Sequence, residues 1–110
     1  MMKLVLLNTT IATTDGTFRI SELSLDEARK LAQANIGNFE NGIGHKATAQ
    51  ILGNLLGIDI EAERVEVAQV VGQKAIVLKM KGRVPEGKIL SEAEMEEIGY
   101  SLKLMEKLED

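Results

Sequence analysis

The sequence contains no cysteine and no tryptophan, and among its 110 residues there is one histidine and one proline. Without cysteine, the chain can form no disulfide and no thiolate metal site, and it cannot use a cysteine nucleophile. A single histidine without cysteine also argues against a structural zinc site within one chain. We therefore expect no metal and no cofactor, and His45 stands out as the one side chain suited to acid–base chemistry near neutral pH.

Aromatic residues are scarce as well, at 3% of the chain, whereas apolar residues make up 45%. The hydrophobic core must therefore be built from Leu, Ile, Val and Met. A chain of 110 residues is long enough for one domain and not for two. A domain of this size buries roughly two-thirds of its unfolded surface, so we expect a modest core in a single domain over residues 1–110.

Long hydrophobic runs are also missing, because the apolar start at residues 2–7 stops at Asn8. Such a run is too short for a signal-peptide core or a membrane span, so we expect a cytoplasmic protein without a membrane partner. The formal net charge of −4 argues against broad binding to a nucleic-acid duplex. Positive charge is concentrated at Lys79, Lys81, Arg83 and Lys88, which is compatible with a local anion site or with a solvated hairpin edge.

The first part of the chain predicts two strands and a helix. Residues 3–8 form an apolar run typical of a buried strand, and Asn8, Thr9 and Thr10 lie at its carboxyl end. Ligands of open α/β sheets bind at that end, but without other support the pattern favours a strand that simply leads into a loop. Residues 18–20 indicate a short strand. Ser24 and Glu27 form a capping box for a helix ending near Asn35.

A glycine-rich stretch, residues 37–44, precedes a second helix. Its apolar positions follow a helical period, and Gly57 is placed to end it. These positions are Thr48, Ile51, Leu52, Leu55 and Leu56. Residues 63–71 and 75–80 then predict a β-hairpin with its turn at 71–74.

Ser91 and Glu94 form another capping box, and Met95, Ile98, Leu102 and Met105 give a last helix its apolar stripe. The expected fold class is α/β, with a small mixed β-sheet flanked by helices.

His45 falls at the start of the second predicted helix, where exposed amides and the helix dipole favour an anion. An imidazole there could act as a general acid toward a bound phosphate, but the dipole disfavours the protonated form. An ordinary capping or surface histidine is the alternative. Arg83 can bind two phosphate oxygens at once, and Glu86 could hydrogen-bond a histidine or a sugar hydroxyl. A local ion pair between Arg83 and Glu86 is the alternative there.

Four blocks of the sequence, in this order, resemble the viral ring-nuclease family. They are Leu6-Leu7-Asn8, Gly42-Ile43-Gly44-His45, Arg64-Val65-Glu66-Val67 and Arg83-Val84-Pro85-Glu86-Gly87-Lys88-Ile89-Leu90. The resemblance covers about residues 3–95. It implies a homodimer that binds cyclic tetra-adenylate, the second messenger of type III CRISPR defence, in a cleft at its interface. It also implies a metal-independent cleavage that leaves linear di-adenylate with a 2′,3′-cyclic phosphate, and viral members thereby act as anti-CRISPR proteins.

The resemblance also implies a role for each matching residue. His45 matches the general acid, Arg83 the arginine that grips the ligand, and Glu86 the acidic residue that keeps the histidine protonated. The implied ligand-binding positions are Asn8, Thr9, Thr10, Gly44, Ala47, Thr48, Arg64, Lys79 and Lys88. Some relatives have serine where this chain has Ala47, and glutamine where it has Lys79, so the contacts to the ligand differ in detail.

Two other classes of function fit parts of the sequence. A protein that sequesters the cyclic nucleotide without cutting it would use the same cleft and the same Arg83. A DNA-binding regulator is a third possibility, and the negative net charge argues against it.

Overall fold

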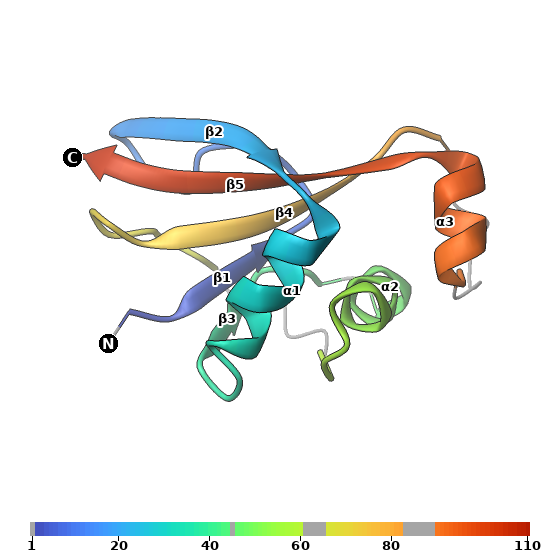
Figure 1. Cartoon of the computed structure of the whole chain (residues 1–110). Helices are drawn as coiled ribbons and strands as arrows, with labels where there is room; N and C mark the ends of the chain where they lie inside the picture. Colours follow the sequence, from blue (N-terminus) through green and yellow to red (C-terminus); the bar gives the residue numbers. More distant parts are fainter. Residues whose placement is uncertain (1, 45, 61–65, 83–89) are drawn as a thin grey trace.

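Five strands form one mixed sheet in the order β2-β5-β4-β1-β3 (Figure 1). They are β1 (Leu4–Leu7), β2 (Thr17–Leu23), β3 (Phe39–Asn41), β4 (Lys74–Met80) and β5 (Tyr100–Glu109). Strand β1 pairs in parallel with β3 and β4, whereas β5 runs antiparallel to β2 and β4. The computed structural model describes residues 2–44, 46–60, 66–82 and 90–110. The predicted α/β class with a mixed sheet is confirmed.

Three helices are present in the described residues: α1 (Leu25–Gln33), α2 (Lys46–Leu56) and α3 (Glu92–Ile98). The predicted capping boxes are both formed, with Ser24 and Glu27 at the start of α1 and Ser91 and Glu94 at the start of α3. After α2, Gly57 has φ +71°, a left-handed conformation that glycine adopts without strain. The starts of α1 and α3 and the end of α2 therefore have causes in the local sequence.

All three helices pack against one face of the sheet. Their buried side chains meet those of the strands in the larger core cluster, which is almost entirely aliphatic as expected. That cluster includes Ala28, Ala32, Ala49, Ile51, Leu52, Leu55, Leu56 and Met95 from the helices and Leu4, Leu6, Ile76, Leu78 and Leu102 from the strands. The Arg29 Nε–H donates to the Leu55 carbonyl at 2.8 Å, which ties α1 to the last turn of α2.

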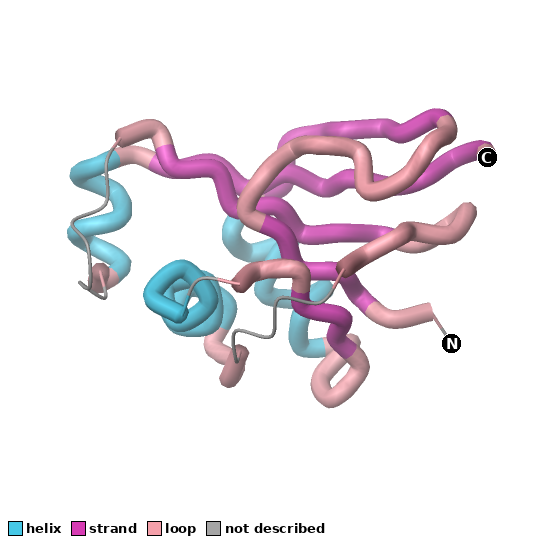
Figure 2. The backbone as a smooth tube through the Cα atoms, turned by 180° about the vertical axis from the view of Figure 1, so that it is seen from behind, coloured by secondary structure: helices cyan, strands magenta, loops and turns pink. Residues whose placement is uncertain are grey.

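The opposite face carries a smaller core cluster to which no described helix contributes (Figure 2). Its members are Val5, Leu7, Val67, Ala75, Val77 and Met105, with Phe18 packed against them. Irregular chain segments cover this face where helices cover the other. The two faces of the sheet are thus protected by different kinds of structure.

The prediction of a last helix running through Met105 is wrong. Helix α3 ends at Ile98, and Gly99, with φ +93°, turns the chain into strand β5. The spacing of Leu102 and Met105 suits a helix, but these side chains lie on opposite faces of a central strand, in the larger and the smaller cluster respectively. A strand buried on both faces shows no simple alternation, so the helical pattern there was accidental.

The predicted hairpin is wrong in its first arm. The turn exists, with Gly72 at φ +90°, but residues 66–70 form no strand and β4 pairs with β1 and β5. The side chains of Gln69 and Gln73 satisfy backbone groups that a strand would have paired. Residues 61–65 lie outside the described part of the chain. Strand β3 was not predicted, because its three residues lie in the glycine-rich stretch, whereas the short strand predicted at 18–20 is confirmed and extends over all of β2.

Candidate functional site

The candidate site is the edge of the sheet at which three parallel strands end. Strands β3, β1 and β4 are neighbours, with Leu6 opposite Asn41 and Leu7 opposite Val77. Because the strands are parallel, the segments after them emerge side by side. The residues after β1, those after β3 that lead into α2, and the last residues of β4 are therefore brought together, although they are far apart in the sequence (Figure 1).

Asn8, Thr9 and Thr10 follow β1 at this edge. Asn8 and Thr9 are exposed and Thr10 is half-buried. Within the described part of the chain, none of the three takes part in a hydrogen bond. Their amide and hydroxyl groups therefore have no partner among the described residues and are free to bond to a ligand.

Asn41, at the end of β3, shapes the neighbouring segment. Its side chain is buried, and Asn41 Oδ1 accepts a hydrogen bond from the Ile43 N–H at 2.9 Å. Next to it, a Cβ on Gly42 would lie 2.8 Å from Leu7 Cδ2 and 3.1 Å from Val67 Cγ2, so a larger residue there would have to displace both side chains. Asn41 was not singled out from the sequence. The Asn41-Gly42 pair, a common turn signal, could have indicated it.

The segment leads through Gly44 into α2, whose first turn contains no acidic residue. Lys46, the first residue of α2, is exposed, and Ala47 and Thr48 are half-buried. Helices α1 and α3, in contrast, carry two acidic residues each in their first turns. The positive end of the α2 dipole is therefore not offset by a carboxylate of its own first turn, which favours an anion from outside the helix.

Lys79 contributes positive charge from β4. Side chains alternate between faces along a strand, so Lys79 continues the row of Ala75 and Val77 on the face away from the helices. Unlike those two residues it is exposed. Of the predicted ligand-binding residues, Asn8, Thr9, Thr10, Gly44, Ala47, Thr48 and Lys79 thus belong to segments that meet at one edge of the sheet.

The predicted catalytic residues His45, Arg83 and Glu86 lie outside the described residues, and so do the predicted ligand-binding residues Arg64 and Lys88. The structure therefore describes the segments after β1 and β3, the start of α2 and the end of β4 at this site.

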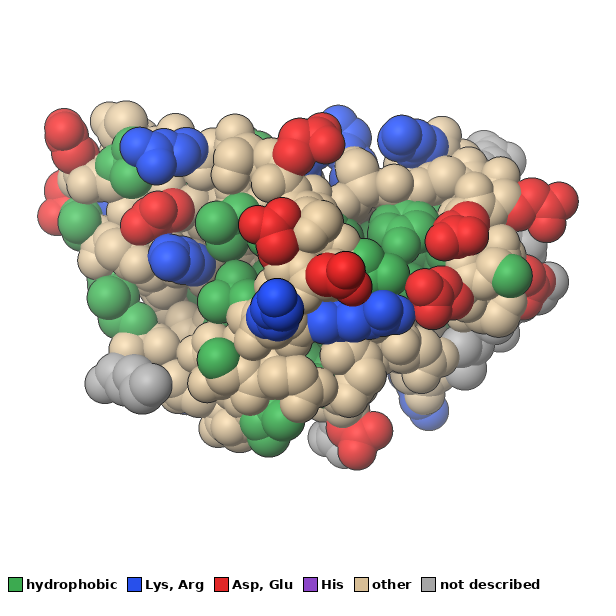
Figure 3. Space-filling model, in the orientation of Figure 1, with side chains coloured by type: hydrophobic (Ala, Val, Ile, Leu, Met, Phe, Trp, Pro, Cys, Tyr) green, Lys and Arg blue, Asp and Glu red, His purple; other side chains and the backbone are tan. Residues whose placement is uncertain are grey.

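Elsewhere, a cavity of about 530 Å³ opens between the end of α2 and the loop before β3. Its lining includes Asp59 and, in the part of the chain that the structure describes, no lysine, arginine or histidine. Such a lining does not suit an anion. In the view of Figure 3, basic side chains are spread over the surface rather than gathered in one patch, and acidic side chains gather at the end where α3 lies. Arg29 and Glu92 form an exposed ion pair, 3.2 Å apart.

The residues that the structure describes contain neither a membrane-spanning helix nor a cluster of metal ligands. No helix among them is long and apolar enough to cross a lipid bilayer. No group of three or more histidine, aspartate or glutamate side chains among them is arranged to hold a metal ion.

The chain is similar in sequence to proteins of a bacterium and of archaeal viruses. It is 33% identical to protein YddF of Bacillus subtilis (strain 168), over 98% of this chain and 100% of that protein. It is 36% identical to protein ORF117 of Acidianus two-tailed virus, over 84% of this chain and 80% of the viral protein. For protein 26 of Sulfolobus islandicus filamentous virus the identity is 34%, over 77% and 71% of the two chains.

The fold is similar to that of B116 of Sulfolobus turreted icosahedral virus, a solved structure. The TM-score is 0.80 at 26% sequence identity, and the match covers 94% of this chain and 97% of the viral protein. The family model described as STIV B116-like matches residues 4–102, and this is the family indicated by the sequence motifs. The chain therefore belongs to the STIV B116-like family, that of the viral ring nucleases.

Proposed function

We propose that this protein is a ring nuclease that cleaves cyclic tetra-adenylate without a metal ion. The observation that carries the proposal is the shared carboxyl edge of β3, β1 and β4. Unpaired polar groups of Asn8 and Thr9, the first turn of α2 without an acidic residue and the exposed Lys79 ammonium meet there. Hydrogen-bond donors combined with positive charge suit a ligand with phosphate and ribose hydroxyl groups.

The chemistry assigned to the site follows from the ligand. A ribose 2′-oxygen bonds to the adjacent phosphorus, the bond from phosphorus to the 5′-oxygen breaks, and the 2′-hydroxyl proton passes to solvent. His45, which directly precedes α2 in the sequence, donates a proton to the departing 5′-oxygen. Arg83 stabilises the charge on the phosphorane, and Glu86 keeps the imidazole protonated. The products are linear di-adenylates ending in a 2′,3′-cyclic phosphate.

The symmetry of the ligand supports a homodimer as the active form. One chain has one histidine, while cutting a four-membered ring into two halves requires the same chemistry at two opposite phosphates. A two-fold dimer supplies the second His45 and forms a shared cleft. By degrading the second messenger, the protein would switch off type III CRISPR signalling in the cytoplasm of its host cell.

The test is incubation of the pure protein with cyclic tetra-adenylate in EDTA, followed by chromatography, with His45→Ala alongside. We expect linear di-adenylate from the wild type, and about 10²–10⁴-fold slower cleavage from the variant with binding retained. Products formed equally by both proteins would remove His45 from the mechanism. Tight binding of a ligand that stays intact would instead indicate a protein that sequesters the cyclic nucleotide without cutting it. Absence of binding would refute the proposal, and duplex binding with a steep salt dependence would then indicate a DNA-binding regulator.

A further inference from the structure

The segment that carries Asn8, Thr9 and Thr10 has few attachments of its own. After β1 ends at Leu7, no described residue forms a hydrogen bond with residues 8–12. The first attachment is Thr13. Its hydroxyl oxygen accepts a hydrogen bond from the Gln69 backbone N–H at 3.0 Å, and its O–H donates to Gln69 Oε1 at 3.1 Å. Thr13 and Gln69 are 56 positions apart in the sequence, so this reciprocal pair joins two distant segments.

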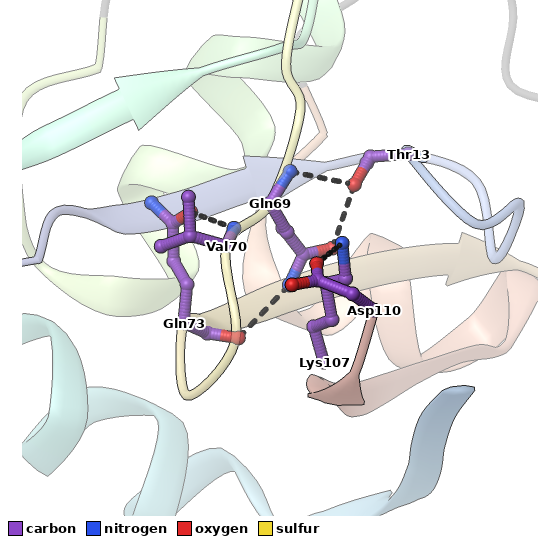
Figure 4. Close-up of polar contacts among 6 residues, drawn as sticks. All are labelled: Thr13, Gln69, Val70, Gln73, Lys107 and Asp110. Atoms are coloured by element: carbon purple, nitrogen blue, oxygen red, sulfur yellow. Dashed lines mark hydrogen bonds and ion pairs between the residues drawn. The ribbon is translucent and has the colours of Figure 1, made fainter. Parts of the chain in front are cut away.

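Further hydrogen bonds fix the position of Gln69. Its side chain is buried, and Nε2 donates to the Gln73 carbonyl at 3.0 Å and to the Met105 carbonyl at 3.2 Å. The turn that follows is closed by Gln73 Oε1, which accepts from the Val70 N–H, and Gln73 Nε2 donates to the Lys3 carbonyl at 2.9 Å. Figure 4 shows Thr13 reaching Gln69 over the sheet, with Gln73 on the other side of the turn. Thr13 is thus hydrogen-bonded to a residue whose own position is fixed by several hydrogen bonds.

The residues just before Gln69 also contact the candidate site. Val67 belongs to the smaller core cluster with Leu7, and it lies against Gly42, which leads toward α2. Residues 66–69 therefore contact both polar segments of the site: the one after β1 through Thr13, and the one after β3 through Gly42. Arg64, a predicted ligand contact, precedes them in the sequence.

We propose that Thr13 and Gln69 are positioning residues for ligand binding, resting on the function proposed above. They fix the far end of a five-residue segment, residues 8–12, whose near end is fixed by β1. An ordered segment loses less conformational entropy when it closes on a ligand, so the pair raises affinity without touching the reacting atoms. This role differs from that of Gln73, whose side chain bonds to Val70 within the turn and to Lys3.

The experiment compares Thr13→Val with Thr13→Ser. Valine has nearly the shape of threonine but no hydroxyl, whereas serine keeps the hydroxyl. We expect Thr13→Val to raise the KM for cyclic tetra-adenylate about tenfold with kcat changed less than about twofold, and Thr13→Ser to stay near the wild type. In the His45→Ala background, the dissociation constant should show the same difference. Gln69→Leu is less suitable, because it removes the buried Nε2 donor from the Gln73 and Met105 carbonyls and endangers folding.

A second readout needs no ligand. Backbone order parameters of residues 8–12, measured by NMR relaxation, should be lower in Thr13→Val than in the wild type, and unchanged in Thr13→Ser. If the wild type binds the ligand but Thr13→Val binds equally well, or if the order parameters are unaltered, the positioning role is refuted and the proposed function stands. If the wild type neither binds nor cleaves the ligand, the proposed function fails and the inference fails with it. A lower melting temperature with unchanged affinity would make the pair merely structural.

Discussion

The N-termini of α1 and α2 show two ways to satisfy the start of a helix. Helix α1 is satisfied by its own residues: the Glu27 N–H donates to Ser24 Oγ at 3.1 Å, and Glu27 Oε1 accepts from the Ser24 N–H at 3.3 Å. Helix α2 has no acidic residue in its first turn, begins with the exposed Lys46, and follows a segment shaped by Asn41 and Gly42. The first arrangement leaves little to bind, whereas the second favours an external anion.

The difference follows the topology. Both helices start at the same end of the sheet. Helix α1 follows β2, an outer strand that the antiparallel β5 separates from β4, whereas α2 follows β3, the other outer strand, which lies directly beside β1. A self-capped N-terminus is suited to stability, and one without acidic residues in its first turn, beside polar loops, is suited to binding an anion. Variants at the two N-termini should therefore separate stability from ligand affinity.

The largest effect on stability is expected from Asn41→Ala. It leaves the buried Ile43 N–H without its acceptor, which typically costs about 1–3 kcal/mol of unfolding free energy. It should also weaken ligand binding, because the approach to α2 loses its fixed shape. Chemical denaturation and ligand titration measure the two effects. Asn38→Ala removes only an exposed bond to the Met2 carbonyl, and it should change stability by less than about 0.5 kcal/mol. Equal losses in both variants would contradict a special role for Asn41.

Reversing the charge of Lys46, the first residue of α2, should separate ligand affinity from stability. Lys46→Glu gives α2 an acidic first turn, so the helix gains about 0.3–1 kcal/mol from its dipole or stays unchanged. Binding of cyclic tetra-adenylate should weaken about tenfold, because the new carboxylate repels the phosphates. Isothermal titration at low salt measures this. Lys30→Glu, in the last turn of α1, makes the same change in net charge and should leave affinity within about twofold. Equal weakening in both variants would show that only net charge matters.

The smallest effect is expected at the self-capped N-terminus. Ser24→Ala should lower the unfolding free energy by about 1 kcal/mol and leave ligand affinity unchanged. The Ser24 hydroxyl and backbone N–H hold the pKa of Glu27 below its usual value of 4.5. Because the pKa of Glu27 is lower in the folded state, its carboxylate stabilises the fold at pH values above 4.5. This contribution is lost as the pH falls through the lowered pKa of the folded state.

The difference in stability between the wild type and Ser24→Ala should therefore shrink in acid. Thermal unfolding between neutral pH and pH 3 tests this. A difference that stays constant, or a change in ligand affinity, would contradict the comparison.

Sequence patterns predicted the elements whose causes are local. The capping boxes at Ser24 and Ser91, the apolar stripe of α2 and the run of β4 all depend on neighbours within a few positions, and all were found where expected. They failed where partners are distant. Whether residues 100–109 form a helix or a strand is decided by β2 and β4, which pair with them on both sides. Gly99 was the one local warning.

The candidate site divides in the same way. Asn8 and Thr9 could be predicted because the rule that ligands bind at strand ends applies to a single strand. Thr13 and Gln69 could not, because their proposed role depends on the contact between them, which bridges 56 positions. Asn41 bonds to Ile43, only two positions away, and the Asn41-Gly42 turn signal could have indicated it. The roles of His45, Arg83 and Glu86 remain predictions from the family resemblance.

The order of strands has a consequence for how the protein is made. Strand β5 is the last to be synthesised of the five, yet it lies between β2 and β4 and pairs with both along its length. While the ribosome is still producing residues 100–109, β2 has no partner in the sheet, and its backbone groups are exposed to other chains. Folding to completion must therefore wait for translation of β5, and a nascent chain stalled before it would be prone to aggregation.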